Sequence, residues 1–214
     1  MIRHAQDSDY GSLSSYQALC QQIKIGDVLT FSGQDIPSSV VKLATRSHYV
    51  HVAIVLSVES NSQQQLDILI AESHIDISLP SVGTGKRVLG VQFQWLSDRL
   101  TEHDGQVWWV PLKQPLTPEG LCQMQAWLRE IEAERIPYDF LQAIEVGIEP
   151  LVKPKAETRL DLSALFCSEL VTRALQLANV VDATLNPSEQ TPSDVMQFPC
   201  FEKPVLIHNL VDDH

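Results

Sequence analysis

Cys167 is a candidate nucleophile because it stands at the expected start of an amphipathic helix. Apolar residues recur at helical spacing from Phe166 to Ala178, and Ser163 or Asp161 could cap the helix in front of them. Free N–H groups and the helix dipole at such a start favour a thiolate over a thiol and can hold an oxyanion during acyl transfer. The alternative is a structural cysteine, since unpaired cysteine often behaves as a small core residue.

A nucleophilic cysteine needs a base and a group that orients the base, and His51 and Glu72 are the candidates. Residues 49–58 are rich in β-branched side chains and predict a strand, and residues 66–72 predict a second one. The two should form an antiparallel hairpin. If its loop is centred on residues 61–62, His51 lies directly across from Glu72, close enough for the carboxylate to hold one imidazole nitrogen.

The alternation along this first strand also predicts where the cysteine helix packs. His51 and Ala53 share one face of the strand. Because Ala53 is small, we expect the helix that carries Cys167 to pack on that face. Cys167, His51 and Glu72 would then form a triad of the Cys-His-acid kind.

Other interpretations of these residues remain open. A histidine in a strand is often structural, and a glutamate at a strand end is often solvated. Together with His51, His48 and His74 could suggest a metal site, but their spacing matches no familiar motif. No two cysteines form a CxxC pair; they are Cys20, Cys122, Cys167 and Cys200. We therefore predict no metal and no cofactor.

The composition narrows the range of partners. The 214 residues carry a formal net charge of −12, with a pI near 4.9. This acidity disfavours nucleic acid and anionic membrane surfaces. The first residues lack the apolar run of a signal peptide, and no apolar stretch is long enough to span a membrane. We expect a cytoplasmic protein with reduced thiols, which binds a small-molecule, peptide or acyl substrate.

The remaining pattern predicts an α+β fold, in which a small antiparallel sheet packs against helices. Residues 1–24 should form a helical arm packed on the same domain, with its helix at 12–24, and residues 25–214 a single catalytic domain. Thr117 and Pro118 mark the start of another helix. Further strands are expected at 28–31, 106–112 and 205–207, and further helices at 40–45, 93–100 and 137–147.

Five motifs together resemble the permuted branch of the NlpC-type papain-like cysteine peptidases and amidases. This branch includes YiiX-like proteins and, more distantly, lecithin:retinol acyltransferase. The motifs follow one another in the expected order, with the histidine before the cysteine: residues 26–33, residues 47–55, Ala71-Glu72, Pro137-Tyr138-Asp139 and residues 166–171. At one position the chain departs from the family, because Val50 stands where a serine often precedes the histidine.

The resemblance implies a circularly permuted papain-like fold and a cysteine hydrolase that cleaves an amide or ester through an acyl-enzyme. Cys167 would be the nucleophile, His51 the base and Glu72 the third residue of the triad. Tyr138 matches a family aromatic that lines the site, although a core residue at a helix start is the alternative. Tyr49 and Ser168, which lie beside the catalytic residues in sequence, are predicted to contact substrate.

Two other functions stay open. The same triad serves acyltransferases and lipid hydrolases, in which an acceptor other than water or a lipid ester is used. A binding module that kept the fold without catalysis is the second alternative, and a buried or unreactive Cys167 would favour it.

Overall fold

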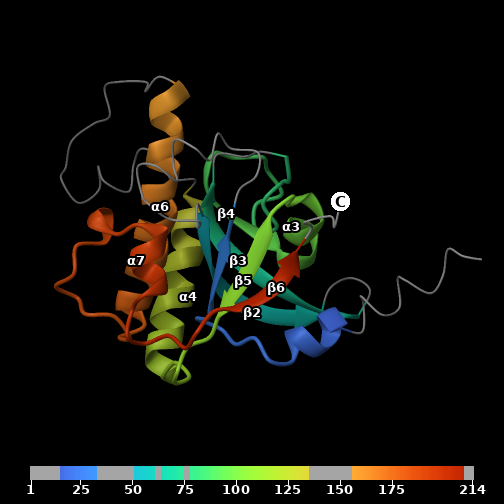
Figure 1. The fold of residues 1–214 in the computed structure, drawn as a ribbon, viewed down its shortest axis with the longest axis horizontal. Coiled ribbons are helices and arrows are strands. Elements are labelled where there is room, and N and C mark those ends of the chain that lie inside the picture. The colour runs from blue at the N-terminus through green and yellow to red at the C-terminus, as the bar shows by residue number, and fades with distance from the viewer. Residues whose placement is uncertain (1–14, 33–50, 61–63, 75–77, 135–155, 210–214) are drawn as a thin grey trace, which may run out of the picture.

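The computed structural model describes residues 15–32, 51–60, 64–74, 78–134 and 156–209, with side chains of the segment from 156 described from Cys167 to His208. Its centre is a six-stranded antiparallel sheet in the order β4-β3-β2-β1-β5-β6 (Figure 1). The strands are β1 (Val28–Phe31), β2 (His51–Ser60), β3 (Leu66–His74), β4 (Gly90–Trp95), β5 (Gln106–Val110) and β6 (Val205–Asn209).

Helices cover both faces of the sheet. They are α3 (Leu96–Glu102), α4 (Pro118–Ala133), α6 (Ala156–Leu177) and α7 (Pro192–Met196), with a 3₁₀ turn η1 (Pro187–Glu189) and a helical turn at residues 15–20. The α4, α6 and α7 helices pack on the face formed by Val52, Ile54 and Leu56 of β2. The α3 helix and the segment after residue 15 pack on the opposite face, against Ala53 and Val55. The α+β class is therefore as predicted.

The alternating direction of side chains along a strand explains why both faces of the sheet carry apolar residues. Successive side chains of a strand point to opposite faces, so a strand that is buried on both sides reads as a continuous apolar run. β2 shows this pattern, because its first seven residues are all buried. Among the described residues the two cores lie on opposite faces of the sheet, so side chains from both faces can approach one another at an end or an edge of the strands.

The hairpin of β2 and β3 has a different register from the predicted one. Ile54 pairs with Ala71, and a β-bulge between Val55 and Ser57 shifts the pairing beyond it. β2 also extends further than expected, because Glu59 pairs with Asp67 and Ser60 with Leu66, so that Glu59 and Ser60, predicted to lie in a loop at 59–65, belong to the strand. Continued to the start of β2, this register brings His51 opposite His74 rather than Glu72.

One of the predicted helix boundaries agrees with the structure and another differs from it. Thr117 caps α4 by accepting a hydrogen bond from the Gly120 N–H, as its position before Pro118 indicated. The expected helix at 93–100 starts later, because Phe93 is still paired in β4 and α3 begins at Leu96. The helices predicted at 40–45 and 137–147 lie outside the described residues.

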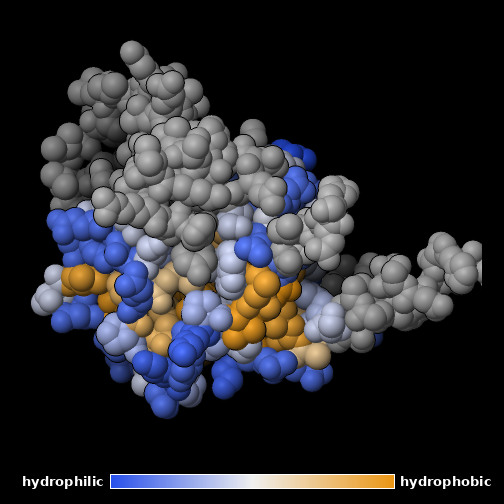
Figure 2. Space-filling view, in the orientation of Figure 1, coloured by the Kyte–Doolittle hydropathy of each residue, from blue (hydrophilic) through white to orange (hydrophobic). Residues whose placement is uncertain are grey.

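The surface in view contains an apolar patch over β6, at one edge of the sheet (Figure 2). Val205 and Leu206 are 45% and 46% exposed there. Among the described helices, none is both long and apolar enough to cross a membrane.

Candidate active site

The predicted contact between His51 and Glu72 is present in the structure. The Nε2 atom of His51 lies 2.7 Å from Oε2 of Glu72, and both residues are buried. The contact is diagonal across the hairpin, because Glu72 and His51 lie on the same face but are not directly paired. Burial of Glu72 excludes the alternative of a solvated strand end.

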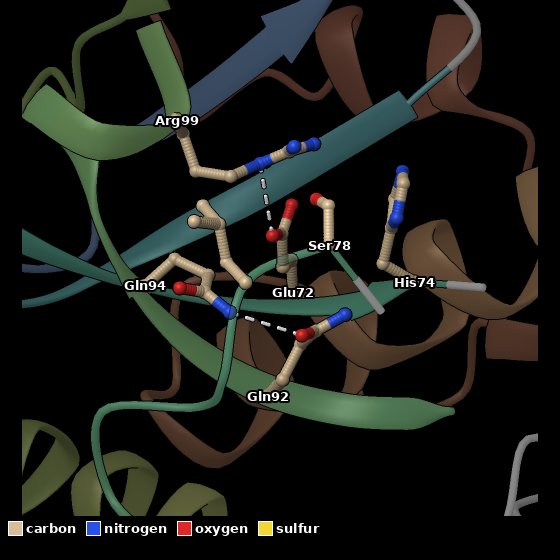
Figure 3. A pocket seen from close by; sticks show the side chains of 7 residues that line it. Glu72, His74, Ser78, Gln92, Gln94 and Arg99 are labelled. Carbon is tan, nitrogen blue, oxygen red and sulfur yellow. Dashed lines mark hydrogen bonds and ion pairs between the residues drawn. The ribbon is translucent and has the colours of Figure 1, made fainter. Parts of the chain in front are cut away.

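Arg99 is the residue of this site that the sequence analysis missed. It reaches from α3 and places its Nε atom 3.1 Å from Oε1 of Glu72 (Figure 3), whereas His51 contacts Oε2. Its guanidinium also lies over the ring of Phe31, with 5.6 Å from Cζ to the ring centroid. One signal was available: Arg99 follows buried Leu96 by three residues, so it falls on the apolar stripe of its helix.

These neighbours keep Glu72 ionised in a buried position. Burial alone raises the pKa of a carboxyl group. The charge of Arg99, followed by the hydrogen bond and charge of His51 and the charge of His74, outweighs burial and holds the pKa of Glu72 far below its ordinary value. Glu72 is therefore a carboxylate over the whole neutral range.

His51 is also within hydrogen-bonding reach of the Cys167 thiol. Burial alone would lower the pKa of His51, but the charge and hydrogen bond of Cys167, together with Glu72, raise it to about 9. Since Nε2 faces Glu72, Nδ1 is the nitrogen left for the sulfur. At neutral pH the site therefore favours a protonated imidazole, and a positive charge beside Cys167 favours a thiolate.

Cys167 does not stand at a helix start, as the sequence indicated, but in the middle of α6. The residues before it include good helix formers such as alanine, glutamate, arginine and leucine, so the helix continues upstream through Asp161 and Ser163 to Ala156. The N–H groups of an interior turn are bonded to carbonyls four residues earlier. The N–H groups of α6 around Cys167 are therefore not free to hold an oxyanion, contrary to what a helix start would have offered.

The predicted packing face of the cysteine helix is also wrong. Cys167 belongs to the core that contains Val52 and Ile54, whereas Ala53 faces the other core. The contact with His51 is nevertheless made because His51 is the first residue of β2. At the end of a strand an imidazole can reach past the backbone to a group on the other face.

Of the remaining predicted site residues, the structure describes Ser168 alone. Ser168 is buried, and its hydroxyl donates a hydrogen bond to the Gln190 carbonyl, which joins α6 to the segment after η1. Its predicted contact with substrate stays a prediction. Tyr138 and Tyr49, and also His48, lie outside the described residues.

His74 adds a second imidazole to the site. Its ring meets that of His51 edge to face, with 4.6 Å between centroids. His74 also lines a narrow polar pocket with Glu72 and Arg99, which Gln92 and Gln94 complete from β4 (Figure 3). The two amides are hydrogen-bonded to each other at 3.0 Å. Within the described part of the chain, no group of three or more His, Cys, Asp and Glu side chains could hold a metal ion.

Comparison with protein-family models and with curated proteins found no match for this chain. The case for its function consequently depends on the residues of the site and their geometry.

Proposed function

We propose that the protein is a cysteine hydrolase that cleaves an amide or ester bond through an acyl-enzyme formed on Cys167. The observation that carries the proposal is that His51 contacts both Cys167 and the ionised Glu72. These three residues come from three separate elements, α6, β2 and β3. The geometry is that of a nucleophile, a base and an orienting acid, which is the arrangement that acyl transfer requires.

The proposed reaction begins with the proton of Cys167 on His51. The thiolate attacks the substrate carbonyl, and collapse of the tetrahedral adduct expels the amine or alcohol, which takes its proton from His51. The neutral imidazole then removes a proton from water, and the resulting hydroxide displaces the acyl group as a carboxylic acid. Cys167 leaves as a thiolate, so the pair returns to its starting state. Glu72 holds the imidazole in place throughout.

This proposal requires an oxyanion donor outside the interior turns of α6, because the N–H groups there are already bonded within the helix. It also requires access to the sulfur. Cys167 is fully buried in the structure, at 0% exposure, so the site must open for a substrate to enter.

The burial of Cys167 favours a second candidate function, a binding module without catalysis. In that case the Cys167–His51–Glu72 contacts would stabilise the fold. The two functions differ in whether the sulfur reacts with an acyl donor while the protein is folded.

Acyl-enzyme trapping tests the proposal. We expect short acyl p-nitrophenyl esters at neutral pH to leave an acyl group on Cys167, detectable by peptide mass spectrometry. The exposed Cys122 of the same chain reports background acylation. His51→Ala should reduce acylation of Cys167 by at least about 100-fold, the lower range for general acid–base catalysis, and leave Cys122 unchanged. Acylation of Cys167 no faster than Cys122 would favour the binding module.

A further inference from the structure

Arg99 closes a ring of contacts around the acid of the proposed triad. Glu72 uses one carboxylate oxygen for His51 and the other for Arg99, at 2.7 Å and 3.1 Å. Arg99 and His51 in turn both pack against Phe31, with 5.5 Å between the ring centroids of Phe31 and His51. Both oxygens are therefore occupied, and the carboxylate cannot rotate away from the imidazole without losing one charged partner.

The burial of the pair shows why this contact matters. Glu72 and Arg99 are 1% and 7% exposed. A carboxylate in such a place is unstable unless it is paired, because burial penalises the charged form. The charge of Arg99 is the largest single interaction that favours the charged form of Glu72 and lowers its pKa.

The other ionisable groups near Glu72 cannot replace the positive charge of Arg99. His51 faces Glu72 from β2, and His74 lies two residues further along β3. Cys167 of α6 interacts with His51, where it supplies no positive charge to Glu72. His103, which follows α3, packs against Phe31, and burial lowers its pKa to about 4, so it is neutral. On the β4 side Gln92 is uncharged.

We propose that Arg99 is a positioning residue of the site, which keeps Glu72 ionised and turns Oε2 towards His51. The inference rests on the proposed function, since it assigns a supporting role in that reaction. Arg99 does not touch the reacting sulfur. It acts through Glu72, and its loss lets Glu72 take up a proton, and stop orienting the imidazole, at a higher pH than in the wild type.

If Arg99 only stabilised the fold, its substitution would lower the free energy of unfolding but leave the titration of Glu72 unchanged. This difference provides the test. The first readout is the ¹³C chemical shift of the Glu72 carboxyl group against pH, in the full-length protein. We expect Glu72 of the wild type to remain ionised well below the ordinary range of glutamate. In Arg99→Met its titration should rise by about one to three pH units, the effect of an opposite charge at this range. Arg99→Lys, which keeps the charge, should recover most of the shift.

A further variant separates the contact of Arg99 with Glu72 from the packing of α3. Leu100→Ala weakens the packing of α3 without touching Glu72, and it should leave the titration of Glu72 unchanged.

The second readout is the pH dependence of Cys167 alkylation. Its acidic limb should move upward with the Glu72 titration in Arg99→Met. In a Glu72→Gln background, Arg99→Met should have no further effect on that limb.

These experiments distinguish failure of the inference about Arg99 from failure of the proposed function. If Cys167 of the wild type is unreactive, the proposed function fails, and Arg99 then has no reaction to support, whatever the titration shows. If Cys167 reacts, an ordinary titration of Glu72 in the wild type overturns the inference about Arg99 alone. Equal titration shifts in Arg99→Met and Leu100→Ala would overturn it as well. The wild-type titration keeps the test valid even if Arg99→Met fails to fold.

Discussion

At the residue scale, His51 is the centre of the site because three different interactions converge on one imidazole. Glu72 accepts a hydrogen bond from Nε2, Cys167 lies within hydrogen-bonding reach of the ring, and the ring of His74 meets it edge to face. Each of the first two partners favours the protonated ring, and together they outweigh the burial that opposes it. The charge state of His51 is thus set by its neighbours and not by solvent.

This charge state predicts how stability depends on pH. The pKa of His51 is raised from 6.5 to about 9 by folding, so the folded state binds this proton more tightly. The resulting stabilisation is complete below about pH 6.5 and is lost as the pH rises through about 9. We expect the difference in free energy of unfolding between wild type and His51→Gln to shrink by on the order of 2–3 kcal/mol between pH 6 and pH 10, measured by urea denaturation.

His103 provides a matched control with the opposite sign. Burial, assisted by the charge of Arg99, lowers the pKa of His103 from 6.5 to about 4. Its contribution to stability is present above about pH 6.5 and is lost as the pH falls through about 4. The effect of His103→Gln should therefore change on the acidic side only. A His51→Gln effect that stays constant or grows towards pH 10 would contradict the assigned charge state.

At the element scale, the position of α6 depends on a close approach to the start of α4. A Cβ atom at Gly120 would lie 2.4 Å from the carbonyl oxygen of Ala178, just beyond the end of α6. The two helices share the core that contains Cys167. Gly120 is therefore required by packing and not by its own backbone conformation.

Gly120→Ala should consequently destabilise the protein, although alanine is the better helix former. We expect a loss of about 1–3 kcal/mol from overpacking, measured as the free energy of unfolding. The control is Ala126→Gly on the exposed side of the same helix, which should cost about 1 kcal/mol through helix propensity alone. A Gly120→Ala variant as stable as the wild type would show that α4 can move away from α6 at no cost.

The elements also show what the sequence could predict. Strands with strong patterns, such as β1 and β2, and the capped start of α4 were found from local signals. The hairpin register was displaced by two residues, because neither a bulge nor the loop length is marked in the sequence. A displacement of two keeps each side chain on its face, so the contact of His51 with Glu72 survived the error.

Other parts of the site depend on contacts between distant segments and could not be predicted. The start of α6 was misplaced because Ser163 and Asp161 resemble capping residues, and only the tendency of the preceding residues to form helix opposes them. Arg99 was missed because a buried arginine becomes understandable only when its carboxylate partner is known. The packing of Cys167 on the Val52 face depends on which side the helix docks, which alternation along one strand does not decide.

At the scale of the whole molecule, the site lies where the two cores meet at one end of the sheet. Phe31 ends β1, His51 begins β2 and His74 ends β3, and these residues are neighbours in the sheet. Arg99 approaches from the helix on one face and Cys167 from the helix on the other. The imidazole of His51 lies between the two faces, which explains how the proposed triad can draw residues from both described cores.

The measurement that tests this account most directly is the rate of iodoacetamide labelling of each cysteine against pH, read by peptide mass spectrometry. We predict that Cys167 of the folded wild type labels faster at pH 6 than the exposed Cys122, because the imidazolium of His51 favours its thiolate. His51→Ala should abolish this advantage and leave Cys122 unchanged. If Cys167 labels no faster than Cys122 at pH 6, or equally fast in His51→Ala, His51 does not make the Cys167 sulfur reactive in the folded protein and the hydrolase proposal is contradicted.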